Sequence, residues 1–315
     1  MAKQVLTTSK FLANPSQLAV VAAKYSSLTI PKQPRKSAEQ GPDALLDSGI
    51  LSNIQSETNY KLTIDHLTQN GTFSNSKEAN NTDPDTNNMK LPRTVRLASK
   101  QVSESVYTHA RQGKFVMTLG GDHSIGMGTV TGVARAIRER FGDSELSVLW
   151  IDAHADINTP ETSPSGRIHG MPVAFASGLA RYGIFDWITA SHLINLKRFV
   201  YIGLRDVDEA EEKARYRKVM DLALEYLGDE TPIHVSYDID SLDPEWVPST
   251  GFPVSPGLSL DEGILISRRL HNTGNLVAMD LVEVNPLIEP EKLDLTVESA
   301  RSIIHAALGV EGKGF

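Results

Sequence analysis

Short hydrophobic runs alternate with longer amphipathic segments along most of the chain. Continuous runs bounded by polar residues predict buried strands, and these are Gln17 to Ala23, Phe115 to Leu119, Leu146 to Ile151, Phe199 to Gly203, Ile233 to Tyr237 and Leu276 to Leu281. Apolar residues at three- and four-residue spacing predict helices, over Val95 to Gln112, Met127 to Phe141, Glu209 to Leu227, Ser259 to Asn272 and Val297 to Leu308.

Strand followed by helix, repeated without a break in composition, predicts an α/β fold. We expect three α-β-α layers with a mostly parallel central sheet, in a single domain over residues 1–315. Residues 70–90 are polar and crowded with Asn, Asp and Thr, so a mobile surface insertion is expected there.

Composition narrows the classes of function. The 315 residues include no cysteine, which excludes disulfides, thiolate metal sites and a cysteine nucleophile. The net charge is −8 and no Lys/Arg-rich stripe is found, so nucleic acid is not an expected partner. The most apolar early run, Leu18 to Ala23, is far shorter than the roughly 20 residues of a membrane span. We therefore expect a cytoplasmic protein with no membrane partner; mitochondrial targeting is the alternative, since the first acidic residue is Glu39.

Carboxylates and imidazoles collect directly after four of the predicted strands, where the loops of a parallel sheet carry binding sites. They are Asp122 and His123; Asp152, His154 and Asp156; Asp238 and Asp240; and Glu283. Residues two apart in an extended segment point the same way, so each group can face one point. So many carboxylates in one crevice would repel each other unless cations lay between them, which favours two bridged divalent ions.

Simpler interpretations apply to isolated residues. A lone Asp-x-Asp after a strand is most often loop or cap chemistry, and a lone histidine is most often a surface or core residue. The latter interpretation is adopted for His66, His109, His192, His234, His271 and His305. Gly120 and Gly121 could serve a turn or a close approach of the backbone to the site, and both interpretations stay open.

Five sequence blocks together resemble the signature of the arginase (ureohydrolase) family, and within it the fungal arginases. The blocks begin at Gly120 (GGDHS), Asp152 (DAHADINT), Ser163 (SPSGRIHG), Ser236 (SYDID, followed by LDP at 242–244) and Met279 (MDLVEVNP). The resemblance covers most of the chain and keeps the order of the blocks. It implies a single arginase-like catalytic domain.

The resemblance implies two Mn²⁺ ions per chain. One would be bound by His123, Asp152, Asp156 and Asp238, and the other by His154, Asp152, Asp238 and Asp240. Such a pair can hold a hydroxide at neutral pH, which would attack the guanidinium carbon of the substrate.

The same resemblance implies roles around the metals. Glu283 matches the guanidinium-binding glutamate, and His169 matches the proton-shuttling histidine, for which titration near neutrality is suitable. Asn158, Ser163, Ser165 and Asp208 match contacts to the amino-acid end of arginine.

The sequence departs from the family pattern at three places. Arg167 stands where arginases usually have Asn, and Phe252 where they usually have Thr; both are candidate substrate-binding residues. The segment from Asp208 to Ile233 has room for one helix but not for the extra strand and helix common in the family. Metal chemistry is untouched by these changes, whereas substrate choice and the edge of the sheet are affected.

Hydrolysis of L-arginine to L-ornithine and urea is the leading prediction. The alternatives are hydrolysis of another guanidino acid such as 4-guanidinobutyrate, and a non-catalytic arginase-like binding protein. The resemblance also implies a homo-oligomer, a trimer or larger.

Overall fold

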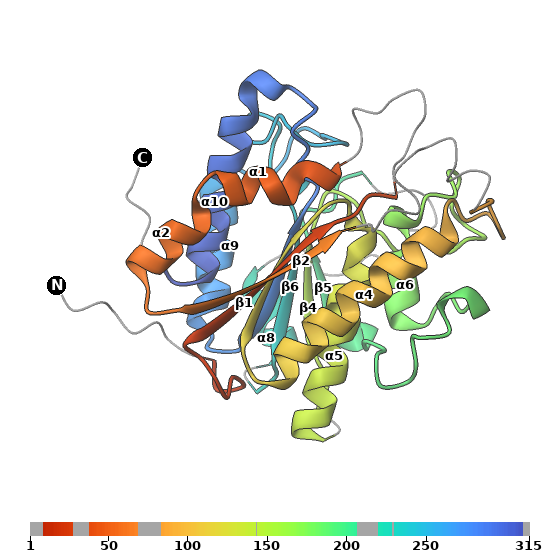
Figure 1. The fold of residues 1–315 in the computed structure, drawn as a ribbon, viewed down its shortest axis with the longest axis horizontal. Coiled ribbons are helices and arrows are strands. Elements are labelled where there is room, and N and C mark those ends of the chain that lie inside the picture. Colours follow the sequence, from red (N-terminus) through yellow and green to blue (C-terminus); the bar gives the residue numbers. More distant parts are fainter. Residues whose placement is uncertain are drawn as a thin grey trace.

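The computed structural model describes residues 9–27, 38–68, 83–142, 144–206, 220–228 and 230–310, and a seven-stranded parallel sheet lies at its centre (Figure 1). The strands are β1 (Gln17–Lys24), β2 (Lys61–Thr68), β3 (Phe115–Gly120), β4 (Ser147–Ile151), β5 (Phe199–Ile202), β6 (Ile233–Asp238) and β7 (Leu276–Val282). Their order across the sheet is β2-β1-β3-β7-β6-β4-β5. The parallel sheet is thus confirmed.

Helices cover both faces of this sheet (Figure 1). One face carries α4 (Pro92–Arg111), α5 (Gly126–Phe141) and α6 (Pro172–Ser177). The other carries α1 (Gly41–Asp47), α2 (Ile50–Glu57), α8 (Met220–Leu227), α9 (Leu260–Asn272) and α10 (Leu293–Ala307). Two separate hydrophobic clusters fill the two interfaces, so the predicted α-β-α layering is confirmed.

Some elements escaped the sequence analysis for clear physical reasons. Strand β2 lies at the edge of the sheet and exposes most of its side chains, so it lacks a continuous apolar run. Helices α1, α2 and α6 have only seven, eight and six residues, too few to show a helical period. Between β5 and β6 the described residues contain one helix, α8; residues 209–219 of the helix predicted over Glu209 to Leu227 lie outside them.

The predicted insertion at 70–90 falls partly outside the described residues, which resume at 83. From there to residue 90 the chain packs onto the protein. The buried Asp83 carboxylate accepts the backbone N–H groups of Arg93 and Thr94 at 3.0 and 2.7 Å, at the start of α4. Met89 is fully buried. The end of this polar stretch therefore belongs to the core and to a helix cap.

The strand order explains how distant sequence blocks meet. Strands β3, β7, β6 and β4 are consecutive neighbours in the sheet, although the two strands of each of the three pairs are far apart in sequence. Their carboxyl ends therefore share one edge, where the residues that follow each strand converge. Within the described ranges, no helix has the length and apolarity to cross a lipid bilayer.

Candidate metal centre

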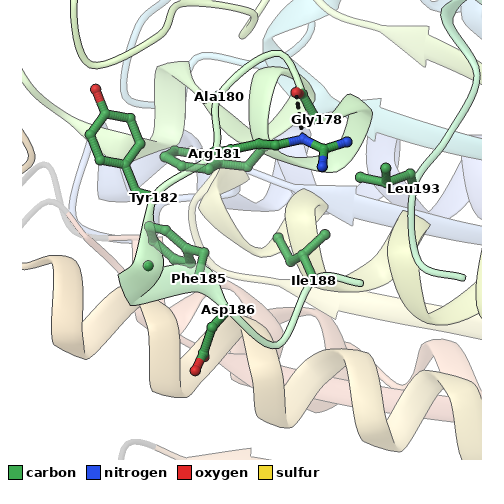
Figure 2. Close-up of a pocket in the computed structure, with 10 residues that line it drawn as sticks. Gly178, Ala180, Arg181, Tyr182, Phe185, Asp186, Ile188 and Leu193 are labelled. Carbon is green, nitrogen blue, oxygen red and sulfur yellow. Dashed lines mark hydrogen bonds between the residues drawn. The ribbon is translucent and has the colours of Figure 1, made fainter. Parts of the chain in front are cut away.

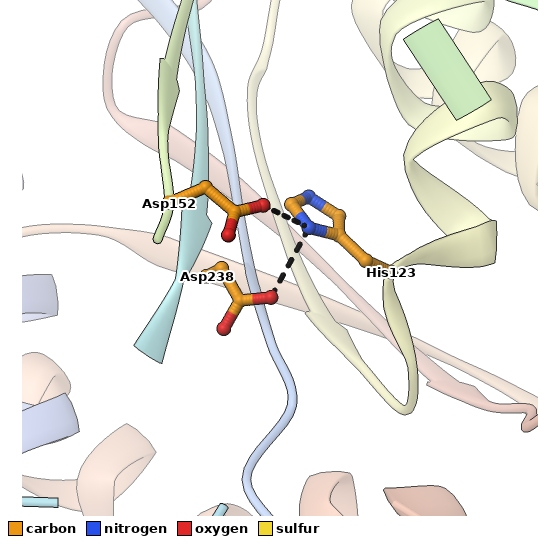
Figure 3. Close-up of side chains that lie close together, drawn as sticks. All are labelled: His123, Asp152 and Asp238. Atoms are coloured by element: carbon orange, nitrogen blue, oxygen red, sulfur yellow. Dashed lines mark ion pairs between the residues drawn. The ribbon is translucent and has the colours of Figure 1, made fainter. Parts of the chain in front are cut away.

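His123 lies at the centre of a cluster of carboxylates (Figure 3). It begins the short 3-10 helix η3 (His123–Ile125) after β3. Its Nδ1 atom is 3.0 Å from Asp152 Oδ2, 3.1 Å from Asp156 Oδ2 and 3.2 Å from Asp238 Oδ2. All four side chains are buried.

A second group surrounds His154. Its Nδ1 atom lies 3.3 Å from Asp152 Oδ1 and 3.3 Å from Asp240 Oδ2. The carboxylate of Asp152 therefore presents one oxygen to each histidine. The Nε2 atom of His154 also lies 3.7 Å from Asp206, a residue that the sequence analysis did not select.

Burial makes this concentration of negative charge costly, and the pKa values reflect it. Burial and repulsion from Asp152 raise the pKa of Asp156 to about 6. Burial, then repulsion from Asp240 and Asp152, raises the pKa of Asp238 well above its usual range. For His123, burial alone would lower the pKa, but the facing carboxylates outweigh it and raise the pKa well above the ordinary value. The cluster thus requires positive charge.

The donor set fits divalent cations. In each of two groups, His123 with Asp152 and Asp238, and His154 with Asp152 and Asp240, the ligand atoms lie within 4.8 Å of one another. The buried Nδ1 of His123 has no hydrogen-bond partner of acceptable geometry among the described residues, although three carboxylate oxygens surround it. Carboxylate oxygens with some imidazole nitrogen suit hard divalent ions such as Mn²⁺.

A buried network behind His123 fixes the orientation of its ring. Ser236 Oγ lies 2.9 Å from His123 Nε2 and donates to Asp280 at 2.7 Å. Asp280 is also 2.7 Å from His234 Nε2 and accepts from Thr129 at 2.6 Å. With Nε2 bonded to Ser236, Nδ1 faces the carboxylates. His234, interpreted from sequence as a core residue, is buried but belongs to this network.

Trp150, in β4, contacts two of the candidate ligands, His123 and Asp152. Its ring stacks on His123 at a centroid distance of 4.1 Å, and its Nε1–H donates to Asp152 at 3.0 Å. Sequence analysis assigned no role to Trp150, or to Ser236 and Asp280 within the quoted blocks, because strand residues in apolar runs carry no visible sign of contacts between strands.

Glu283 is held in a left-handed conformation, with φ = 65°. Its backbone N–H donates to Gly121 O at 2.8 Å, and its Oε1 accepts from the His123 N–H at 2.8 Å. A Cβ on Gly121 would lie 1.8 Å from Tyr25 O, so this glycine permits a close approach of two backbone segments rather than a left-handed turn. The Oε2 of Glu283 is buried and has no partner among the described residues. Burial, then repulsion from Asp122, raises its pKa well above the usual range.

A cavity of about 170 Å³ opens above the cluster. It brings together most of the residues selected from sequence: His123, His154, Asp156, Asn158, Ser163, Ser165, Arg167, His169, Asp238, Asp240, Phe252 and Glu283. Asp152 lies fully buried beneath it, and Asp208 lies outside the described residues.

The loop that follows β4 forms the outer wall of this cavity. Asn88 pins it by donating from Nδ2 to Pro160 O and Ser163 O, both at 2.8 Å. Arg167 is half-buried on the same wall, and within the described part of the chain its guanidinium has no hydrogen bond or ion pair. Glu161, a potential partner for Arg167, instead accepts a hydrogen bond from the Tyr182 hydroxyl.

Phe252 stands between two histidines of the cavity. Its ring centroid is 5.4 Å from that of His169 and 6.3 Å from that of His154. Burial lowers the pKa of His169 to about 4, below the near-neutral titration expected from sequence. The imidazole is therefore neutral at pH 7, and its buried Nδ1 has no partner among the described residues.

A parallel α/β sheet with histidines and shared carboxylates at the ends of its central strands defines a protein with a candidate two-cation centre. The chain belongs to the arginase family, whose sequence profile matches residues 16–309.

Individual arginases are similar to this chain in sequence and in structure. The chain is 43% identical to an arginase of Emericella nidulans, covering 95% of this chain and 96% of that protein, and 45% identical to an arginase of Neurospora crassa, covering 96% and 88%. The crystal structure of Entamoeba histolytica arginase in complex with L-ornithine matches with a TM-score of 0.79 at 26% identity, over 94% of this chain and 98% of that one.

Proposed function

We propose that this protein hydrolyses L-arginine to L-ornithine and urea, using two Mn²⁺ ions per chain. The observation that carries the proposal is that the two His–carboxylate groups and the unpaired Oε2 of Glu283 face one cavity. Membership of the arginase family and the similarity to fungal arginases support it.

The residues fit the following assignment. His123, Asp152, Asp156 and Asp238 would hold one ion, and His154, Asp152, Asp238 and Asp240 the other. When bound, a pair of divalent cations offsets the carboxylate charge and lowers the pKa of water so that it can act as a nucleophile at neutral pH.

Glu283 would bind and orient the guanidinium. Its Oε1 is already held by the His123 N–H, so Oε2 is left to accept N–H groups from the substrate. Burial, then repulsion from Asp122, raises the pKa of Glu283, and a cation bound at Oε2 would offset both effects. A guanidinium supplies both the charge and the planar donors that a carboxylate accepts.

His169 would move the proton that the leaving amine needs. Hydrolysis breaks the bond between the guanidinium carbon and the side-chain nitrogen of arginine, and that nitrogen must leave as a protonated amine. The neutral imidazole of His169 can accept a proton at one ring nitrogen and pass it on, and its side chain lines the cavity.

The outer wall would recognise the amino-acid end. Asn158, Ser163 and Ser165 line it with polar groups. Asp208, which lies outside the described residues, is proposed to contact the same end of the substrate. The unpaired guanidinium of Arg167 favours a substrate with a carboxylate, which it could bind through two hydrogen bonds. This observation also keeps 4-guanidinobutyrate as a second candidate substrate, because Arg167 would repel a nearby ammonium.

Urea release from L-arginine, 4-guanidinobutyrate and agmatine, measured after Mn²⁺ loading together with elemental analysis, tests the proposal. Urea from arginine with about two Mn²⁺ per chain is the expected result. Bound metal without urea from any of the three compounds would contradict the activity. A cytoplasmic location and a trimeric or larger assembly stay predictions.

A further inference from the structure

A second cavity lies beside α6 (Figure 2), and it shares no lining residue with the cavity above the candidate metal centre. We call it the α6 cavity; its volume is about 220 Å³, and Phe175, Tyr182, Phe185, Ile188 and Leu193 supply most of its apolar lining. The rings of Phe175 and Phe185 lie 4.5 Å apart and are nearly fully buried. Cavities of about 150 Å³ with similar walls hold a benzene ring, so one aromatic ring with a short substituent fits here.

Two charged side chains line this cavity. Asp186 is paired with Arg96 of α4 at 3.0 Å. Arg181 folds back over the end of α6, where its Nε donates to Gly178 O at 3.3 Å (Figure 2). Within the described residues no hydrogen bond or ion pair engages its two Nη atoms. The unpaired charge of the cavity is therefore positive and offers two parallel donors, which suit a carboxylate.

The walls of the α6 cavity are connected to the metal centre in two ways. The Tyr182 hydroxyl donates to Glu161, in the loop that carries Asn158 and Ser163. Phe175 belongs to α6, whose first turn donates from Val173 N to Asp156 O at 3.0 Å. A small molecule that packs on Phe175 and Tyr182 thus restrains the loop at 158–167 through Glu161, and it restrains Asp156 through α6.

We propose that the α6 cavity is an effector site for a small aryl carboxylate. The ring packs against the apolar lining of the cavity, on Tyr182, Phe185 and Ile188, and the carboxylate pairs with Arg181. Occupancy orders the loop at 158–167 before substrate arrives, so the apparent KM for arginine falls. This effect on KM rests on the proposed function, whereas binding to the cavity does not.

Binding is tested first, on the full-length protein, by isothermal titration with phenylacetate. Benzyl alcohol and acetate serve as matched probes that lack the charge or the ring. Phenylacetate is expected to bind at least tenfold more tightly than either probe. Arg181→Gln should weaken it by about 10- to 100-fold, since a hydrogen bond to a charged group is lost. Arg268→Gln, an exposed arginine of α9 on the other face of the sheet, should leave it unchanged.

Ile188→Trp gives an independent check, because the larger side chain fills the cavity and should abolish binding while Arg181 stays in place. Phenylacetate that fails to bind the native protein, or that binds both variants as it binds the native chain, would overturn the site.

The coupling between the α6 cavity and substrate binding is tested by measuring the KM for arginine with and without saturating phenylacetate. We expect at least a twofold fall in the native protein and a smaller fall in Tyr182→Phe, which keeps the ring and the contact of α6 with Asp156 but loses the hydroxyl that donates to Glu161. A KM unmoved by bound phenylacetate would overturn the effector role. If no urea is formed, the Kd for arginine provides the same comparison, so failure of the activity and failure of the site are distinguishable.

Discussion

Ser236 Oγ lies 2.9 Å from His123 Nε2 and connects that histidine to the buried carboxylate of Asp280. This contact leaves Nδ1, on the other side of the ring, facing Asp152, Asp156 and Asp238. The orientation of the His123 ring is thus set by Ser236, a residue of β6 that lies two positions before the candidate ligand Asp238.

Removing this hydroxyl should weaken the metal site without removing a ligand. Ser236→Ala is expected to lower Mn²⁺ affinity by about 10- to 100-fold, since the ring loses its fixed orientation. Competition with a metal-sensitive dye measures the affinity. Ser302→Ala is the matched control, because that serine donates only to its own helix at Glu298 O. Equal affinity in Ser236→Ala and the control would contradict the role of Ser236.

Metal removal should affect both activity and stability. We expect about two Mn²⁺ per chain by elemental analysis, no urea release after chelation, and a lower Tm in the metal-free protein. A ligand that binds only the folded state at about 1,000 times its Kd stabilises that state by about 4 kcal/mol. A Tm that does not respond to Mn²⁺, with no bound metal, would refute the site.

Asp238 and His169 should have separable roles. Asp238→Ala should lose most metal affinity together with turnover, because a carboxylate shared by the proposed ions is removed. His169→Ala should keep its metal and lose about 10²- to 10⁴-fold in kcat through lost proton transfer. Metal content and kcat are measured on the same samples. Loss of metal from His169→Ala would make His169 a ligand and the assignment wrong.

Arg167 should determine the choice among guanidino substrates. Arginine and 4-guanidinobutyrate carry a carboxylate, whereas agmatine does not, so agmatine is expected to be the poorest substrate. Arg167→Asn should lower kcat/KM for the two acids by about 10- to 100-fold relative to agmatine, because a charged hydrogen bond is lost. Ratios of kcat/KM for the three compounds give the result. A ratio that Arg167→Asn leaves unmoved would place Arg167 outside recognition.

Asp280 should make part of the stability depend on pH. Burial alone would raise its pKa, but hydrogen bonds from His234 and other neighbours outweigh burial and lower the pKa. A depressed carboxyl pKa stabilises the fold above the unfolded value of about 3.9, and this stability is lost as the pH falls further. Asp280→Asn should therefore be less stable than the native protein at pH 7, by about 1.5–3 kcal/mol, because hydrogen bonds to a charged acceptor are lost.

The difference in the free energy of unfolding between the native protein and Asp280→Asn should narrow below about pH 3.9. Thermal unfolding in chelator at pH 7 and at lower pH measures it, with the exposed Asp294→Asn as control. A gap that stays constant across this range would show that the Asp280 charge does not stabilise the fold.

The sequence by itself determined the elements and the chemistry of this protein. Apolar runs and helical periods located six of the seven strands within a residue or two, because burial on both faces of a parallel sheet leaves a continuous hydrophobic signal. Carboxylates and histidines at the ends of those strands indicated a cation site, since such residues cannot be packed together without positive charge.

The tertiary structure alone decided which strand ends lie side by side and which residues hold the candidate metal ligands in place. Strand order places the ends of β3, β7, β6 and β4 side by side, and no local pattern encodes that order. The hydrogen bond from Ser236 to Asp280 and the stacking of Trp150 on His123 join residues from different elements. The edge strand β2, the buried Met89 and the unpaired side chain of Arg167 likewise depend on what packs around them. Such contacts are long-range, and the residues that make them carry ordinary local propensities.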